Sequence, residues 1–315
     1  MRIQDAVLDA LEKNRGEYLS GEQLASSLGV SRNAVWKAIQ KLEEAGHKIR
    51  AVPKRGYTLA PESDVLTVQS VSRFLDTDMP VYLQVQTEVT STNTLLKAQA
   101  EQGAPEGTVL IAESQTAGKG RLGRHFTSPP GTGIYFSLLL RPHCTAEKSL
   151  FITTTAAVAV CEAIEQVTGL NPQIKWVNDV LMNGRKLCGI LTEATIEGET
   201  GTVSSLVVGI GINLQPNPAC AISDFGKPPR RAELAAAVLN HFEDVYMLLE
   251  QGKEPELLEQ YRERLCCINR PVTVSSPAGR YEAECVGLDE NAHLLVKTAD
   301  GQVNALSSGE ISIRL

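Results

Sequence analysis

The sequence predicts an α+β protein of several domains, with a helical N-terminal module, a central mixed α/β domain and a small C-terminal β domain. In residues 1–60, apolar residues recur at helical spacing. Strand-like and helical segments then alternate over residues 81–270, and short β segments separated by turns fill residues 271–315. A chain of 315 residues is long enough for two or three domains with one sizeable core. We place the boundaries so that the domains span residues 1–62, 63–269 and 270–315.

The composition is typical of a soluble globular protein, with 43% hydrophobic and 5% aromatic residues. We expect no membrane span, because no apolar run approaches the roughly 18 residues required. The segment Met1–Ala6 also lacks the apolar core of a signal peptide. The seven cysteines are scattered and form no C-x-x-C pair. We therefore expect a reduced, cytoplasmic protein whose cysteines are small buried hydrophobic residues.

Charge is distributed unevenly along the chain. The net charge is −7, yet residues 1–60 hold ten Lys and Arg against seven Asp and Glu, a balance of +3. A basic module on an acidic remainder predicts a polyanionic partner for the module alone.

The N-terminal module is predicted to begin with two helices. Apolar residues of the first recur at helical spacing, at Ile3, Val7, Leu8 and Leu11. Ser20 and Gln23 have the spacing of a capping box, so a second short helix is expected to start there and to end at Gly29.

A third helix and a basic hairpin complete this module. Ser31 is expected to cap the helix, and Gly46 to end it. Two short strands, 48–52 and 57–59, flank a basic tip. This order predicts a winged helix-turn-helix, whose recognition helix enters the DNA major groove. The residues expected to contact DNA are Arg32, Asn33, Lys37, Lys54 and Arg55. The alternative is a three-helix protein-interaction module with solvated Lys and Arg side chains.

The remaining elements follow from alternation and helical periodicity. Residues 60–80 are predicted to be a polar linker followed by a short helix. Strands are expected at 81–85, 134–140, 173–176, 189–193 and 206–212. Helices are expected at 147–167 and 232–250. Turns at 276–279 and 299–301 separate the short β segments of a predicted C-terminal barrel.

A glycine-rich basic loop, Gly118–Arg124, follows the apolar run 108–112. Its glycines allow close approach to a ligand, and its three cations can bind carboxylate or phosphate oxygens. It formally matches G-x-G-x-x-G, but the Pro-rich segment 127–131 cannot continue as the long helix that a dinucleotide site requires. The alternative is a flexible, solvated surface loop.

Four polar clusters interrupt the apolar strands of the central domain, at Ser91–Asn93, Gln115 with the basic loop, Lys175–Asp179 followed by Arg185–Gly189, and Asn213. Polar groups at strand ends are typical of ligand sites in α/β proteins. Taken singly, the first cluster can also be a helix cap, and the third a hairpin that turns at Asn183-Gly184.

Together the clusters indicate one chemistry. Neutral hydroxyl and amide groups suit an uncharged polar ring, at Ser91, Thr92, Asn93 and Gln115. Cations suit a carboxylate beside phosphates, at Lys119, Arg121, Arg124, Lys175 and Lys186. Asp179 can help to hold Mg²⁺ on substrate phosphates. No hydride-cofactor fingerprint, Walker loop or G-x-S-x-G turn is evident. This pattern favours activation of a small carboxylic acid on a nucleotide.

The ordered motifs resemble those of the biotin–protein ligases. They are Thr90–Asn93, Gln115 through Arg124, Lys175–Asp179, Arg185–Leu191 and Gly209–Asn213. The tail from Asn269 to Ser312 is similar to that family's SH3-like C-terminal domain. The winged helix, with Ser20–Leu24 and Gly56-Tyr57, resembles the bifunctional members that also repress biotin operons. The resemblance therefore implies a bifunctional biotin–protein ligase and biotin operon repressor.

The resemblance also implies roles for individual residues. Biotin would be bound by Ser91, Thr92, Asn93, Gln115, Lys119, Gly120, Arg121 and Lys186. ATP would be bound by Arg121, Arg124, Lys175, Asn178, Asp179 and Asn213. Arg121 and Lys186 would be the catalytic residues, and Asp179 would hold Mg²⁺. The chain departs from the family pattern at Val177, usually proline, at Lys119 and Leu122, often arginine, and at His125-Phe126, usually a basic residue and Trp.

The reaction implied is ATP-dependent formation of biotinyl-5′-AMP, followed by transfer of biotin to a lysine of a biotin carboxyl carrier protein. Operator DNA and, when ligand is bound, a second copy of the chain would be further partners, and no membrane is expected. Three alternatives remain open. One is a ligase whose winged helix no longer regulates transcription. The others are a lipoate or octanoate ligase or transferase, and a ligand-sensing repressor without ligase activity.

Overall fold

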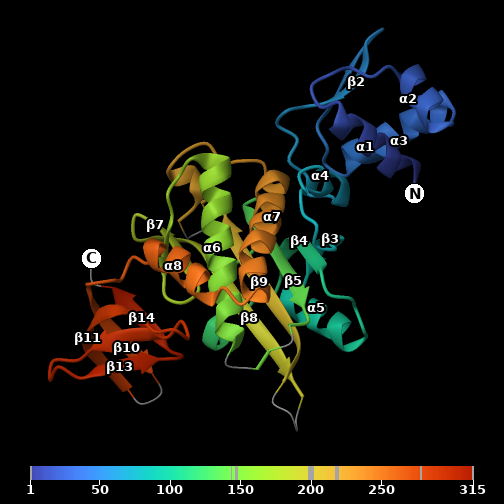
Figure 1. The fold of residues 1–315 in the computed structure, drawn as a ribbon. Helices are drawn as coiled ribbons and strands as arrows, with labels where there is room; N and C mark the ends of the chain where they lie inside the picture. The colour runs from blue at the N-terminus through green and yellow to red at the C-terminus, as the bar shows by residue number, and fades with distance from the viewer. Residues whose placement is uncertain are drawn as a thin grey trace. The chain divides into compact units, whose positions relative to one another are not determined.

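The computed structural model describes residues 2–142, 144–145, 148–197, 202–216, 220–276 and 279–313. The chain divides into two compact units, and Figure 1 labels most of their elements. The first unit consists of Met1–Leu75 together with Arg230–Ala236, and the second of Asp76–Pro229 and Ala237–Leu315.

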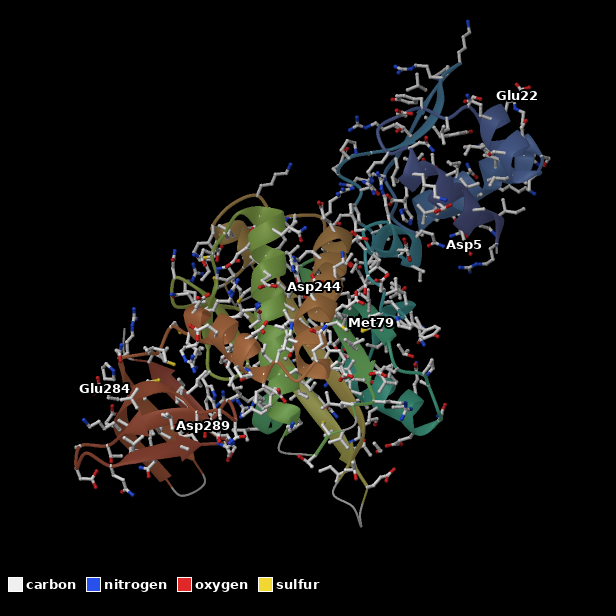
Figure 2. All side chains as sticks on the ribbon, viewed as in Figure 1. Asp5, Glu22, Met79, Asp244, Glu284 and Asp289 are labelled. Atoms are coloured by element: carbon white, nitrogen blue, oxygen red, sulfur yellow. The ribbon has the colours of Figure 1, made fainter. Side chains whose placement is uncertain are left out.

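The first unit contains the predicted winged helix-turn-helix. Its elements are α1 (Ile3–Lys13), α2 (Gly21–Leu28), α3 (Arg32–Glu44), the antiparallel strands β1 (Ile49–Val52) and β2 (Gly56–Leu59), and α4 (Val68–Ser72). Ser20 and Gln23 form the expected capping box, and Gly29 ends α2 in the left-handed conformation. The Ser31 hydroxyl accepts a hydrogen bond from the backbone N–H of Ala34 and caps α3. Asp5 and Glu22, labelled in Figure 2, belong to α1 and α2.

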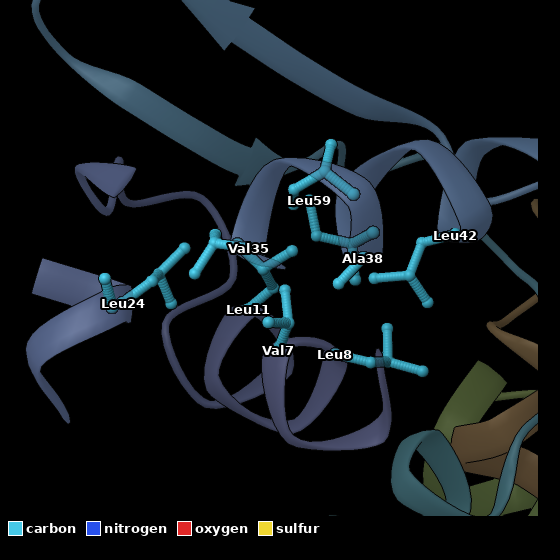
Figure 3. Close-up of a cluster of buried hydrophobic side chains, with 10 residues drawn as sticks. Val7, Leu8, Leu11, Leu24, Val35, Ala38, Leu42 and Leu59 are labelled. Atoms are coloured by element: carbon cyan, nitrogen blue, oxygen red, sulfur yellow. The ribbon is translucent and has the colours of Figure 1, made fainter. Parts of the chain in front are cut away.

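The core of this unit gathers apolar side chains from all three long helices and from β2. Figure 3 shows Val35, Ala38 and Leu42 of α3 turned toward the side chains of α1. Gly56 has φ +105°, and a Cβ there would lie 2.1 Å from the Leu19 carbonyl oxygen. Only glycine therefore lets β2 begin this close to the segment before α2.

The second unit is built on a seven-stranded mixed sheet in the order β3-β4-β5-β9-β8-β7-β6. The strands are β3 (Tyr82–Val89), β4 (Thr108–Gln115), β5 (Gly133–Leu140), β6 (Gln173–Lys175), β7 (Asp179–Met182), β8 (Arg185–Ile196) and β9 (Val203–Asn213). β3 and β4 are parallel, and the other neighbours are antiparallel. β7 and β8 form the hairpin considered in the sequence analysis, with positive φ at Asn183 and Gly184.

Helices cover both faces of this sheet. Helix α5 (Thr92–Glu101) packs through Leu96 and Ala100 on Leu139 and Val207. Helix α6 (Ser149–Thr168) contacts the other face, where the Thr153 hydroxyl donates to the Thr192 hydroxyl. These two contacts lie on opposite faces of the sheet. Thr192 pairs with Val208 and shares its face, whereas Val207, the next residue along β9, points to the other face, because successive residues of a strand alternate.

Two further helices pack around α6. They are α7 (Arg231–Glu250) and α8 (Glu254–Arg264). His241 of α7 contacts Glu162 and Gln166 of α6, and the two helices lie side by side in Figure 1. Helix α8 was not predicted from the sequence, whereas α6 and α7 correspond to the two predicted long helices. Residue 147, the expected start of α6, lies outside the described residues.

Helix α6 corrects the expectation that no segment has the length and composition of a membrane span. Its 20 residues have a mean hydropathy of 1.4 in the most apolar window, but 72% of that window is buried inside the protein. We interpret α6 as a core helix of the mixed sheet, whose apolar character follows from this burial.

The C-terminal segment forms the predicted small β domain. Five antiparallel strands follow the order β13-β12-β11-β10-β14. They are β10 (Pro271–Ser276), β11 (Gly279–Leu288), β12 (Leu294–Lys297), β13 (Val303–Leu306) and β14 (Glu310–Ile313). The turn predicted at 276–279 includes residues 277 and 278, which lie outside the described residues.

Candidate functional site

One cavity in the second unit brings the predicted polar clusters together. It has a volume of about 150 Å³. The predicted residues that line it are Ser91, Thr92, Asn93, Gln115, Lys119, Gly120, Arg121, Arg124, Lys175, Asn178, Asp179 and Lys186. Asn213 is the exception among these described residues, because it is buried at the end of β9 opposite Gly133. Segments far apart in the sequence thus converge on one site.

The neutral end of the cavity is a hydrogen-bonded cluster at the start of α5. The Ser91 hydroxyl accepts from Thr94 N–H and caps the helix, as the alternative interpretation held. The Thr92 backbone N–H donates to Gln115 Oε1 at 2.8 Å, and Gln115 Nε2 donates to the Ser128 hydroxyl at 2.8 Å. A backbone N–H can only donate, so it fixes the orientation of the Gln115 amide.

Asn93 is bonded to protein groups through both of its polar atoms. Its Nδ2 donates to the Leu191 carbonyl at 3.1 Å and to Glu193 Oε2 at 2.9 Å. Its Oδ1 accepts from the Ser137 hydroxyl at 2.6 Å. Ser137 also lies 2.7 Å from the Thr92 hydroxyl oxygen. These bonds support a positioning role for Asn93, which ties the start of α5 to the sheet.

Glycines on β8 and β9 form the floor of the cavity. Gly189 pairs directly with Gly211, and Gly209 pairs with Ser137 and Leu191. A Cβ at Gly209 would lie 2.1 Å from Asn93 Oδ1, and one at Gly211 would lie 2.5 Å from the Phe126 ring. The missing side chains therefore leave room for Asn93 and for the aromatic ring at the end of the basic loop.

The basic loop forms a hydrogen-bonded turn, and four of its residues line the cavity. Its backbone closes through Gly120 N–H to the Arg124 carbonyl at 2.7 Å and Phe126 N–H to the Gly118 carbonyl at 2.9 Å. Leu122 and Gly123 adopt positive φ at its exposed tip. The Phe126 ring meets Tyr135 edge-on, with ring centroids 6.3 Å apart.

Charged side chains at the other end of the cavity are paired with one another. Lys186 Nζ lies 2.6 Å from Asp179 Oδ1, and Lys175 Nζ lies 3.9 Å from Asp179 Oδ2. Arg121 donates to Asn178 Oδ1 at 3.0 Å and to the Gly309 carbonyl at 3.1 Å. Two ammonium groups share one carboxylate, so this end carries a net positive charge that suits an anionic ligand.

The donors at the cationic end limit how Mg²⁺ can bind there. Among the described side chains, no group of three or more His, Cys, Asp or Glu residues is arranged to hold a metal ion. Of the described residues that line the cavity, Asp179 alone has a carboxylate, and two lysines flank it. Mg²⁺ usually binds through one or two carboxylates plus substrate phosphates. The donor set therefore fits Mg²⁺ only if phosphates supply most of its ligands.

The C-terminal β domain contributes to the same site. Ile311 of β14 lines the cavity, and the Gly309 carbonyl accepts from Arg121 as described above. Trp176, almost fully buried, donates from Nε1 to the Ala292 carbonyl at 3.1 Å. The peptide bond between Trp176 and Val177 is cis.

The sequence analysis missed several residues that build this site. Ser137 and Glu193 orient Asn93, and Ile311 closes one wall. A signal for Ser137 exists, because it is the one residue with an aliphatic hydroxyl within the apolar run 134–140. Ile311 carries no such signal, since nothing local in the sequence indicates that β14 reaches the cavity.

The predicted DNA-contacting residues all lie on the surface of the first unit. Arg32, Asn33 and Lys37 are exposed on α3, and Lys54 and Arg55 are exposed between β1 and β2. The Arg55 guanidinium lies 4.3 Å from the centroid of the Tyr18 ring, a cation–π contact that holds the wing tip in place.

Known families match three parts of the chain. Residues 4–58 match an HTH domain, residues 85–213 match the biotin/lipoate A/B protein ligase family, and residues 267–314 match the biotin protein ligase C-terminal domain. These matches follow the order of the winged helix, the mixed sheet and the C-terminal β domain.

Full-length relatives and a solved structure agree with these matches. The bifunctional ligase/repressor BirA of Bacillus subtilis is 34% identical over 99% of this chain and 98% of its own length. The Escherichia coli protein of the same name is 30% identical over 95% and 94%. The biotin protein ligase of Aquifex aeolicus, solved in complex with biotin and ATP, superposes with a TM-score of 0.63 at 30% identity, over 73% of this chain and 97% of that one. The chain belongs to the biotin protein ligase family, among the relatives named bifunctional ligase/repressor.

Proposed function

We propose that this protein is an ATP-dependent biotin–protein ligase. An oxygen of the biotin carboxylate attacks the α-phosphorus of ATP, pyrophosphate leaves, and biotinyl-5′-AMP forms. The amine of a lysine on a biotin carboxyl carrier protein then attacks the acyl carbon and displaces AMP. The observation that carries this proposal is one cavity with a neutral hydrogen-bonding end and a cationic end.

The neutral end would bind the ureido ring of biotin. A cyclic urea presents N–H donors and a carbonyl acceptor, and Ser91, Thr92 and Gln115 offer hydroxyl and amide groups at the cavity surface. Asn93 would hold these groups in place through its bonds to Ser137 and Glu193. Apolar surface from Phe136, Trp176, Ile190 and Leu191 lines the same cavity and suits the ring and aliphatic chain.

The cationic end would bind the carboxylate and the phosphates. Lys186 would exchange its partner Asp179 for the biotin carboxylate, and Arg121 would stabilise negative charge that develops at the α-phosphate. Lys119 and Gly120 would close the loop over biotin. Arg124, Lys175, Asn178 and Asp179 would contact the nucleotide, and Asp179 would help to hold Mg²⁺. Mg²⁺ would neutralise phosphate charge when bound. Asn213 is assigned to the nucleotide on its motif alone.

The chemistry requires no covalent enzyme intermediate, which agrees with the burial of two thiols, Cys161 and Cys188. Burial raises the pKa of the Cys188 thiol to about 12 and raises that of Cys161 further. Such thiols are poor nucleophiles at neutral pH. Catalysis would depend on positioning and on charge stabilisation.

The second proposed activity is biotin-responsive repression by the winged helix. Residues 1–62 would bind operator DNA, residues 63–269 would carry the ligand chemistry, and residues 270–315 would complete the site. A single module with charge +3 would bind DNA weakly, whereas two modules on a liganded homodimer gain effective concentration. Closure of the loop over the adenylate would favour the dimer and so couple ligand to DNA binding. We place the protein in the cytoplasm, where carrier protein and DNA are both accessible.

Pyrophosphate–ATP exchange with the purified protein tests the enzymatic proposal. We expect exchange only when biotin is present, followed by biotin transfer to a carrier protein detected by streptavidin blotting. Exchange with lipoate or octanoate instead would assign the protein to a sister activity. An absence of exchange with all three acids would favour a sensor that only binds its ligand.

Fluorescence anisotropy with operator DNA tests the proposed coupling. We expect tighter binding when biotin and ATP are present together than with either alone. Equal DNA affinity with and without the adenylate would exclude ligand-controlled repression and leave a ligase with a non-regulatory winged helix.

A further inference from the structure

One tryptophan is exposed in the middle of the recognition helix. The chain contains two tryptophans, of which Trp176 is 2% exposed and Trp36 is 47% exposed. Trp36 lies on α3 between core residues Val35 and Ala38, whose side chains turn toward α1 in Figure 3. It belongs to the opposite, solvent-facing side of the helix.

The neighbours of Trp36 on this face are the residues proposed to contact DNA. Arg32 and Asn33 precede it by four and three positions and are exposed, as is Lys37, which follows Asn33 by four positions. Residues at these spacings form one surface of a helix. Trp36 therefore lies inside the proposed DNA-contacting surface.

The distribution of charge along α3 indicates which part of this surface suits DNA. Cations occupy positions 32, 37 and 41, and no carboxylate occurs before Glu43 and Glu44 at the far end of the helix. The N-terminal residues of a recognition helix are the ones that meet base edges. Trp36 is the fifth residue of α3, within that contacting part.

The indole ring of Trp36 is apolar, so it suits one particular feature of a base pair. Arg and Lys side chains bind guanine edges or phosphates, and Asn binds adenine, all by hydrogen bonds. The C5-methyl group of thymine is the apolar feature of the major groove, and it is recognised by apolar contact. Of the exposed side chains on the contacting part of α3, Trp36 is the large apolar one, and an aromatic ring buries much area on contact.

We propose that Trp36 is a specificity-determining residue of the recognition helix, which packs against a thymine methyl group in the major groove. This inference rests on the proposed DNA-binding function. It adds a recognition contact that charge alone cannot provide, because phosphate contacts position the protein without reading sequence.

The test begins with a duplex selected from a random-sequence pool by the full-length protein in the presence of biotin and ATP. The selected duplex is then synthesised with deoxyuridine in place of each thymine in turn, which removes only a methyl group. We expect one such replacement per half-site to weaken binding by wild-type protein about fivefold to tenfold. We expect Trp36→Ala to weaken binding to the unmodified duplex about tenfold and to be insensitive to that replacement, as a double-mutant cycle requires for a direct contact.

Two controls separate this contact from general effects. Ile3→Ala removes another exposed apolar side chain of the first unit, 41% exposed on α1, and should leave DNA affinity unchanged. Trp36→Phe should keep part of the methyl sensitivity and also isolates the fluorescence of the buried Trp176. The difference between wild type and Trp36→Phe should show that DNA shields Trp36 from acrylamide quenching. Biotin-dependent exchange should be unchanged in all three variants.

The outcomes distinguish this inference from the function on which it rests. If wild-type protein enriches no sequence, both the DNA function and the role of Trp36 are wrong. If it binds a selected duplex but no deoxyuridine replacement matters, or if Trp36→Ala stays equally sensitive to it, the role of Trp36 alone is wrong. Loss of self-association in Trp36→Ala, with DNA affinity per dimer unchanged, would also overturn it and indicate a protein interface.

Discussion

The two ends of the cavity differ in how their polar groups are bonded. At the neutral end, Thr92, Asn93 and Gln115 bond to partners within the protein that include backbone groups and buried hydroxyls. At the cationic end, Lys175 and Lys186 share the Asp179 carboxylate, and Arg121 bonds to Asn178 and Gly309. The neutral end is therefore fixed by the fold, whereas the cationic pairs are ones that phosphate oxygens can replace.

This difference indicates that the two ends have different functions, selection of the ligand at the neutral end and stabilisation of charge at the cationic end. A network whose donors and acceptors are fixed before binding can select a ring by the pattern of its hydrogen bonds, because a mismatched ligand leaves buried groups unpaired. The lysine and arginine side chains of the cationic end can leave their protein partners. They can then bind the biotin carboxylate before the reaction and the phosphate oxygens of the adenylate after it. Substitutions at the two ends should consequently change different kinetic constants.

The largest effect is expected from Arg121→Ala at the cationic end. Removal of one preorganised donor that stabilises developing charge should lower the rate of adenylation by on the order of 10²–10³. The reactive adenylate should also escape more readily from the loop. Single-turnover formation and filter retention of biotinyl-5′-AMP measure both effects. Near-normal rate and retention would show that Arg121 does not contact the reacting phosphate.

A smaller effect is expected from Gly209→Ala at the neutral end. The added methyl would lie 2.1 Å from Asn93 Oδ1, so Asn93 must move and lose bonds that hold α5. Overpacking of this kind costs about 1–3 kcal/mol. We expect the KM for biotin to rise by roughly tenfold to a hundredfold, with the KM for ATP nearly unchanged. Gly226→Ala is the matched control, because a Cβ there meets nothing within 4 Å. An equal rise in both KM values would show that the two ends are not independent.

The smallest effect is expected from Ser137→Ala. This change leaves Asn93 Oδ1 without its hydroxyl donor and takes a neighbour from the Thr92 hydroxyl. An unpaired buried acceptor costs about 1–3 kcal/mol of folding stability. The midpoint of urea unfolding should fall, and the KM for biotin should rise by a few fold without change in the rate of carrier transfer. Unchanged stability would mean that Ser137 does not hold Asn93 and that the neutral end is less fixed than described.

Local signals in the sequence predicted the parts of the fold that depend on neighbouring residues. The caps at Ser20 and Ser31 and the turn at Gly29 were predicted from side chains within three or four positions of the bonds they make. Helix α8 was missed because its sequence, EPELLEQYRER, is mostly polar, and only Leu257, Leu258 and Tyr261 are buried. Its place in the fold depends on α6 rather than on its own periodicity.

Spacing and side-chain chemistry act over a few positions, so the sequence alone indicates the order of the domains and the residue types of the candidate site. The tertiary structure alone decided how those residues are bonded. Asn93 meets Glu193 across 100 positions, and Arg121 meets the Gly309 carbonyl across 188. Such pairings cannot be predicted from a local sequence pattern. They form only when the strands align in register and the C-terminal β domain packs against the sheet, so each depends on packing throughout the unit.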